Sequence, residues 1–419
     1  MTVDRPDRLR YLVAAAGAAT MSLTVIGCGG SHPQQPVLAA PAGSARLLAT
    51  MQGVIWSFRQ VNGSAGLLRS TSRGRRWAVA LPAPGAGSRL VASFFFGGGT
   101  AWAVERTAAT GAVVVLRTAN GGRSWGRNAL PGAAAAGPAA SYQIYFADAL
   151  HGWVLASGAR QGPPSASPLP HGRQQMMLWS TVNTGRTWTA LPGRSLPMQG
   201  MPLAGVGQGS CSDQPDITFA NPVDGWLTQG SCGHGTAKPR VWRTRDGGRT
   251  WAPAPLPAPA GGWGTWAGAL KITKKRTVVT TAGVDVGQVR LVRTGVDAIL
   301  LVPVSVGRSG LVIERSSDGG RNWQVAGRVH LGRQAGGRAP DWWFDPVDVA
   351  RWVISAPGRL IETADGGRSW TYVGSASKLP AAPISFLDLR HGFLLGAGAV
   401  AAFHTADHGQ TWTAQPAPQ

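Results

Sequence analysis

A short hairpin motif occurs seven times in this chain, and its repetition constrains the fold more strongly than any other feature. Each copy begins with Ser or Thr, usually has Asp or Asn two residues later, continues with a pair that is mostly Gly, and ends on Trp. The copies, numbered box 1 to box 7, cover residues 70–77, 118–125, 181–188, 244–251, 316–323, 363–370 and 405–412. Repetition of one short unit at such intervals is typical of a propeller or a solenoid.

The residues of the box are those that a tight hairpin turn requires. Asp-Gly or Asn-Gly supplies the positive φ angles of the turn, and the carboxylate or amide can accept hydrogen bonds from nearby backbone N–H groups. Apolar runs precede the boxes, and the Trp offers a large face to a neighbouring layer. Each box is therefore predicted to join two strands. The predicted structural residues are Asn120, Asn183, Asp246, Asp318, Asp365 and Asp407 in the turns and Trp125, Trp188, Trp251, Trp323, Trp370 and Trp412 after them.

A second motif alternates with the boxes: an aromatic, a short acidic turn, then Gly and a second aromatic. Clear copies cover residues 146–153, 219–226 and 386–393, looser ones lie at 53–56, 96–102 and 344–352, and the fifth repeat lacks one. Roughly four short strands fit in each repeat. The sequence thus predicts an all-β protein, a seven-bladed β-propeller of four-stranded antiparallel blades with the boxes on the outer rim.

The box resembles the Asp-box, or BNR repeat, of sialidases and related propellers. Its alternation with the second motif is similar to the photosystem II assembly and stability factor group. The resemblance covers about residues 45–416 and implies the propeller fold, but the same repeat serves hydrolases, receptors and assembly factors. A sialidase would carry a Phe-Arg-Ile-Pro motif, and residues 58–61 depart from it at two positions. The sialidase Tyr nucleophile has no convincing counterpart among Tyr142, Tyr145 and Tyr372.

The N-terminus has the pattern of an export signal. Arg8 and Arg10 precede an apolar stretch over 11–27, and residues 25–28 resemble a bacterial lipobox ending in Cys28, the residue that would be lipidated. An uncleaved anchor and a plain secretory signal are the alternatives. The predicted organisation is a signal peptide over 1–27, a flexible tether over 28–44 and a propeller over 45–419. The expected location is the outer face of the bacterial cytoplasmic membrane, or outside the cell.

The two remaining cysteines, Cys211 and Cys232, flank one copy of the second motif. In an oxidising compartment they are predicted to form a disulfide that contributes about 3 kcal/mol. Their spacing does not suit a zinc site. The sequence leaves ring closure open: the first and last blades can pack together, or residues 36–50 can add a strand to the last blade.

The chain carries a net charge of +21, which favours anionic partners. Many of the arginines fall in or beside the boxes, so the charge is spread around the rim, and a nucleic-acid surface is disfavoured. One compact basic cluster remains, formed by Lys271, Lys274, Lys275 and Arg276. It is a candidate contact for anionic lipid headgroups or cell-wall polymers.

Six tryptophans belong to neither motif, and two of them, Trp179 and Trp242, lie on predicted strands that enter boxes. The unassigned ones are Trp263, Trp266, Trp342 and Trp343. They are candidate binding residues that could stack on sugars or contact a protein partner, and core packing is the alternative. Few acids lie outside the motifs, and no Ser/His/Asp set, phosphate loop or dinucleotide motif is present. We therefore expect no catalytic residues, no cofactor and no metal. The favoured function is a monomeric, non-enzymatic binding or assembly module that contacts an envelope protein, and the alternative is a glycan-binding or glycan-hydrolysing propeller.

Overall fold

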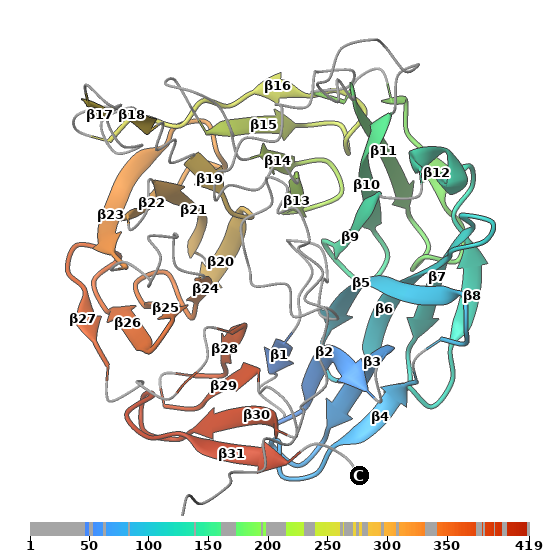
Figure 1. Ribbon diagram of the computed structural model, residues 1–419, viewed down its shortest axis with the longest axis horizontal. Helices are drawn as coiled ribbons and strands as arrows, with labels where there is room; N and C mark the ends of the chain where they lie inside the picture. Colours follow the sequence, from blue (N-terminus) through green and yellow to red (C-terminus); the bar gives the residue numbers. More distant parts are fainter. Residues whose placement is uncertain are drawn as a thin grey trace, which may run out of the picture.

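The computed structural model describes a ring of β-sheets with a single short 3₁₀ helix among the residues it covers (Figure 1). The described residues are 47–49, 53–61, 64–82, 84–137, 140–160, 173–193, 196–197, 215–229, 239–259, 263, 271–273, 276–278, 284–294, 297–306, 310–331, 342–373, 379, 382–388, 390–395 and 400–416. Within these ranges, no helix has the length and apolar character needed to cross a membrane.

Seven antiparallel sheets surround a central axis, which confirms the predicted seven-bladed propeller (Figure 1). Blade 1 contains β1 (Leu47–Ala49), β2 (Ile55–Val61), β3 (Ser64–Ser70) and β4 (Ala78–Leu81). Blade 2 contains β5 (Ser88–Phe96), β6 (Thr100–Thr107), β7 (Val113–Thr118) and β8 (Gly126–Ala129). Blade 3 contains β9 (Ser141–Phe146), β10 (Gly152–Arg160), β11 (Arg173–Thr181) and β12 (Thr189–Ala190). The 3₁₀ helix (Ala133–Ala136) lies between blades 2 and 3.

The remaining blades follow the same order from the inner strand to the outer strand. Blade 4 contains β13 (Asp216–Phe219), β14 (Gly225–Gln229), β15 (Arg240–Thr244) and β16 (Ala252–Pro253). Blade 5 contains β19 (Val284–Val286), β20 (Arg290–Thr294), β21 (Asp297–Val306), β22 (Gly310–Ser316) and β23 (Gln324–His330), and blade 6 contains β24 (Trp343–Pro346), β25 (Trp352–Ala356), β26 (Arg359–Thr363) and β27 (Thr371–Tyr372). Blade 7 contains β28 (Ile384–Phe386), β29 (Gly392–Leu395), β30 (Val400–Thr405) and β31 (Thr413–Pro416).

Blade 5 departs from the regular pattern. Its inner strand is split into β19 and β20, which pair with successive halves of β21. A separate hairpin, β17 (Lys271–Thr273) with β18 (Arg276–Val278), lies between blades 4 and 5 in sequence and at the outer edge of the ring (Figure 1). The sequence motifs did not predict either feature.

Every box forms the turn between the third and fourth strands of its blade, so the predicted position on the outer rim is confirmed. In box 6, Thr363 Oγ1 accepts the Gly367 N–H at 2.9 Å, and Asp365 Oδ1 accepts the Ser369 N–H at 2.9 Å. Boxes 2, 3, 4, 5 and 7 repeat both bonds. In box 1, Ser72 stands in for the acid, and its hydroxyl accepts the Arg76 N–H at 2.7 Å. The side chain therefore closes each turn, as its residue type predicts.

The aromatic residues of the second motif join one blade to the next. Trp153 of blade 3 stacks on Phe219 of blade 4 at 3.6 Å between ring centroids, and its Nε1 donates to Gly247 O in box 4 at 2.9 Å. Trp102 of blade 2 makes the equivalent contacts with blade 3, stacking on a Phe ring at 3.6 Å and donating to a box 3 carbonyl at 2.9 Å. The Gly of the motif leaves room for the motif's own Phe ring, since a Cβ at Gly152 would lie 2.4 Å from Phe146.

The ring closes by packing between blades 7 and 1, without exchange of strands. All four strands of blade 7 lie between residues 384 and 416, and β1 pairs with β2 of its own blade. A core cluster of Ile55, Leu68 and Trp77 from blade 1 with Phe393 and Ala402 from blade 7 fills the joint. The first of the two closure mechanisms that the sequence allowed is therefore the one the described strands use.

Candidate functional site

The unassigned tryptophans do not converge on one surface. Trp263 is 5% exposed and packs in the core between blades 4 and 5. Trp342 and Trp343 are half-buried and pack against two different clusters, on either side of blade 6. Trp266 lies outside the described residues. A binding role for these residues stays a prediction. Trp263 lies between blades 4 and 5, whereas Trp342 and Trp343 lie on the two sides of blade 6.

The basic cluster is described only in part. Lys271 and Arg276 lie on the β17–β18 hairpin, paired with Val278 and Thr273, whereas Lys274 and Lys275 fall outside the described residues. All three cysteines, Cys28, Cys211 and Cys232, also fall outside them, so the disulfide and the lipidation site stay predictions.

Two acids that the motifs left unassigned have structural partners. Glu105 forms an ion pair with Arg127 at 2.9 Å. Asp216 is 5% exposed and accepts a hydrogen bond from Gln143 Nε2 at 2.6 Å, which links the inner strands of blades 3 and 4. No group of three or more His, Cys, Asp or Glu side chains in the described ranges could hold a metal ion.

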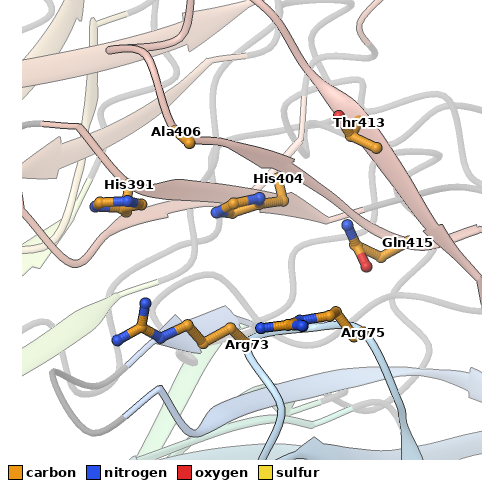
Figure 2. Close-up of a pocket in the computed structure, with 7 residues that line it drawn as sticks. All are labelled: Arg73, Arg75, His391, His404, Ala406, Thr413 and Gln415. Atoms are coloured by element: carbon orange, nitrogen blue, oxygen red, sulfur yellow. The ribbon is translucent and has the colours of Figure 1, made fainter.

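A pocket of about 280 Å³ lies at the joint that closes the ring (Figure 2). Box 1 of blade 1 forms one wall, and the turn and strands of blade 7 form the other. Figure 2 shows two of the three arginines of box 1, Arg73 and Arg75, facing the imidazoles and the amide of blade 7. The polar residues that line the pocket are Arg73, Arg75, His391, His404, Thr413 and Gln415. All of them can donate hydrogen bonds, and none of the described lining residues is acidic.

Two residues distinguish the closing joint from three of the other joints. At the joints after blades 1, 4 and 5, an arginine that precedes the box lies against the box of the next blade: Arg69 on Gly121, Arg243 on Gly319 and Arg315 on Gly366. In blade 7 the residue at this position is His404, which is shorter. The residue opposite it is Arg73, at the box position that is Gly in the other three joints.

The aromatic residue beside His404 also differs from the aromatic residues beside the arginines at the equivalent position. Arg69 and Arg243 lie over Trp56 and Trp226, whereas His404 lies beside Phe393 at 4.7 Å between ring centroids. Phe393 still packs near Gly74 of box 1, where a Cβ would lie 3.2 Å from its ring. It is smaller than Trp and has no N–H to donate to the box. The shorter histidine and the smaller ring together leave the space between the two blades.

Positive groups crowd the pocket. Burial, then His391, Arg73 and Arg75, lower the pKa of His404 from its usual value. The His391 ring lies 6.2 Å from the His404 ring, and its Nδ1 bonds to Asp388 Oδ2 at 3.0 Å. Asp388 also accepts two backbone N–H groups of its own turn, and these bonds lower its pKa against the effect of burial. The nearest carboxylate is therefore engaged in the motif's own turn.

Glu314 is a second unusual group, remote from this pocket. Its side chain on β22 is fully buried, and neither carboxylate oxygen has a hydrogen-bond partner among the described residues. Its register neighbours on the two adjacent strands are Val302 and Val325. Burial raises the pKa of this carboxyl to about 8, although Arg328 acts in the opposite direction.

Comparison with known proteins agrees with the motif analysis. Residues 304–418, about a quarter of the chain, match the family described as Photosynthesis system II assembly factor YCF48. The resemblance to that group is confirmed. The match covers the end of β21, then β22 and β23 of blade 5, and blades 6 and 7, and it includes one wall of the pocket. No curated protein sequence matches this chain.

Several solved structures are similar to this chain, each with a TM-score below 0.5. YCF48 bound to D1 peptide has 15% identity and a TM-score of 0.47, and the match covers 88% of this chain and 94% of that chain. A prolyl endopeptidase has 9% identity and a TM-score of 0.48, and the match covers 90% of this chain and 50% of that chain. An α-L-arabinanase from Penicillium chrysogenum complexed with arabinobiose has 13% identity and a TM-score of 0.35, and the match covers 64% of this chain and 78% of that chain.

The sequence motifs did not single out the closing pocket. The arginines of the boxes were interpreted as charge spread around the rim, and this holds for most of them. The signal lay in the exceptions: box 1 has Arg73 where four boxes have Gly, and blade 7 has His404 where four blades have Arg. These exceptions matter only when blades 7 and 1 are known to touch.

Proposed function

We propose that this protein is an exported, lipid-anchored propeller that acts as a non-enzymatic binding or assembly module at the cell envelope. The observation that carries the proposal is the match of residues 304–418 to an assembly-factor family. The described residues support it, because the recurring acids and aromatics act in turns and joints.

The distribution of acids favours binding over hydrolysis. A glycosidase of the usual kind needs two carboxylates on either side of the scissile bond. Glu105 is paired with Arg127, and Asp216 is buried against Gln143, so neither faces an open cavity as a free acid. The box acids are held by the hydroxyl and N–H groups of their own turns. The distribution of acids therefore supports a protein partner better than a glycan substrate.

The anchor is proposed from the N-terminal sequence. Lipidation of Cys28 would hold the propeller on the outer face of the cytoplasmic membrane, with residues 29–44 as the tether. The experiment is metabolic labelling with a radioactive fatty acid, followed by membrane fractionation, for the wild type and Cys28→Ser. We expect the label and the membrane association to be lost in the variant. Equal labelling of both proteins would contradict the anchor.

The binding role is tested by crosslinking in intact cells followed by purification of the propeller from detergent extracts. We expect one envelope protein to be recovered in constant proportion with the wild type and not with a tagged, unrelated lipoprotein. The glycan alternative is tested in parallel by tryptophan fluorescence titration with cell-wall and plant oligosaccharides. Turnover of an oligosaccharide, with no protein partner recovered, would overturn the proposal.

A further inference from the structure

The pocket between blades 7 and 1 has the chemistry of an anion site. We propose that it binds a phosphate group, free or esterified to a small carrier, and that the bound anion fastens the ring at its closing joint. The inference goes beyond the proposed envelope role, because it concerns a ligand of the propeller itself and not its protein partner.

The arrangement of donors supports an oxyanion with several oxygens. Arg73 and Arg75 present guanidinium groups from blade 1, while His404 and the Gln415 amide face them from blade 7 (Figure 2). A guanidinium fork matches the geometry of phosphate oxygens. A phosphate monoester carries nearly two negative charges and three acceptor oxygens, so it can bond to both walls at once. The volume of about 280 Å³ leaves room for part of a carrier as well.

Arg73 occupies a turn position that most boxes fill with glycine. Its φ is 53°, in the left-handed region that side chains with a Cβ disfavour. The same position in boxes 2, 4, 5 and 6 is Gly, with φ between 71° and 73°, and in boxes 3 and 7 it is Thr184 and His408, with φ of 66° and 62°. The stem of Arg73 lies over Gly53, where a Cβ would come within 2.8 Å of Cγ. Box 1 thus holds the charged side chain of Arg73 at the closing joint, in a turn position where glycine would fit with less strain.

The charges around the pocket also favour a bound anion. The groups that face it are Arg73, Arg75, His391 and His404, and the carboxylate nearest to them, Asp388, is bonded to His391 and to its own turn. Asp407, in the adjacent box, is held by Thr405 and Thr411. An anion bound between the walls would relieve the mutual repulsion of Arg73 and Arg75. It would also bridge blades 7 and 1, which are neighbours in the ring and lie at opposite ends of the propeller sequence.

The test is isothermal titration calorimetry of the purified propeller with inorganic phosphate, glycerol 3-phosphate and succinate, each at the same ionic strength in chloride. We expect one phosphate or phosphate ester to bind per chain and succinate to bind more weakly. Free phosphate that binds as tightly as the ester identifies the ion as the ligand, and a tighter ester identifies a carrier. Absence of phosphate binding to the wild type, or succinate binding as tight as that of phosphate, would overturn the proposal.

Variants place the ligand in the pocket. Arg73→Gly and Arg75→Gln should each weaken phosphate binding by about tenfold, because each removes a charged hydrogen-bond donor. Arg368→Gln is the matched control, since Arg368 has the same place in box 6 as Arg75 has in box 1 and does not line the pocket. Its affinity for phosphate should equal that of the wild type.

Thermal unfolding separates ligand binding from folding. In phosphate-free buffer Arg73→Gly should unfold at the wild-type temperature or above it, because glycine relieves the left-handed strain. Phosphate should raise the unfolding temperature of the wild type and of Arg368→Gln, and not that of Arg73→Gly. A phosphate-dependent rise of the same size in Arg73→Gly would place the ion elsewhere and refute the assignment.

Discussion

Replacing Glu314 with Gln should change how the stability of the propeller depends on pH. In the folded protein burial raises the pKa of this carboxyl from 4.5 to about 8, and both carboxylate oxygens lack partners. The unfolded chain ionises near 4.5, whereas the folded protein keeps the proton up to about pH 8. Between these values the folded state binds one more proton than the unfolded state, so the free energy of unfolding falls as pH rises. The slope is about 1.4 kcal/mol per pH unit. By pH 7 the accumulated loss is about 3 kcal/mol.

The assay is urea unfolding followed by tryptophan fluorescence at a series of pH values from 5 to 8. The observable is the difference in unfolding free energy between Glu314→Gln and the wild type, because it cancels the pH dependence of the other groups. We expect this difference to grow in favour of the variant by about 1.4 kcal/mol per pH unit. Glu362→Gln, at a half-buried glutamate beside box 6, is the matched control for the loss of a glutamate charge. A difference for Glu314→Gln that stays constant with pH would refute the reasoning.

Three further predictions concern the joints, the turns and the cysteines. Trp153→Phe should lower the unfolding free energy by about 1 kcal/mol more than Trp77→Phe does in urea titrations, because Gly247 O loses its donor, whereas the buried Nε1 of Trp77 has no partner in the described structure. Hydrogen bonds from Ser369 and Thr363 lower the pKa of Asp365 to about 2. The ionised carboxylate therefore stabilises the folded protein above about pH 4, and this contribution is lost as pH falls toward 2. The thermal midpoint of Asp365→Asn should fall less over that interval than the midpoint of the wild type. Mass spectrometry of non-reduced digests should find Cys211 linked to Cys232, and Cys232→Ser should cost about 3 kcal/mol of stability; free thiols at both positions in the exported protein would exclude the bond.

Much of the fold could be predicted from local chemistry. A box such as residues 363–370 contains its own hydroxyl, carboxylate and glycines, and it makes its turn from contacts within eight residues. The Gly of the second motif is likewise explained nearby, since Gly152 makes room for Phe146. Features without a repeated pattern were not predictable in this way. The split inner strand of blade 5 and the β17–β18 hairpin occur once each, so no second copy reveals them.

The candidate site was beyond the reach of sequence because its walls come from opposite ends of the chain. Arg73 and His404 are separated by most of the propeller, and each departs from its own motif at a single position. Their proximity depends on the number of blades and on how the ring closes. The buried state of Glu314 is similar: its strand reads as an outer strand of a blade, and only the packing of blade 4 against blade 5 removes its carboxylate from water.

The amino-acid sequence by itself determined the repeat, the hairpin turns, the aromatic pairs and hence the seven-bladed ring, because those features rest on contacts between residues close in the chain or repeated along it. The tertiary structure alone decided that the ends meet by packing, that a basic pocket opens where they meet, and that the buried carboxylate of Glu314 has no hydrogen-bond partner among the described residues. These properties arise from contacts between residues that are distant in sequence and occur once, so no periodicity encodes them.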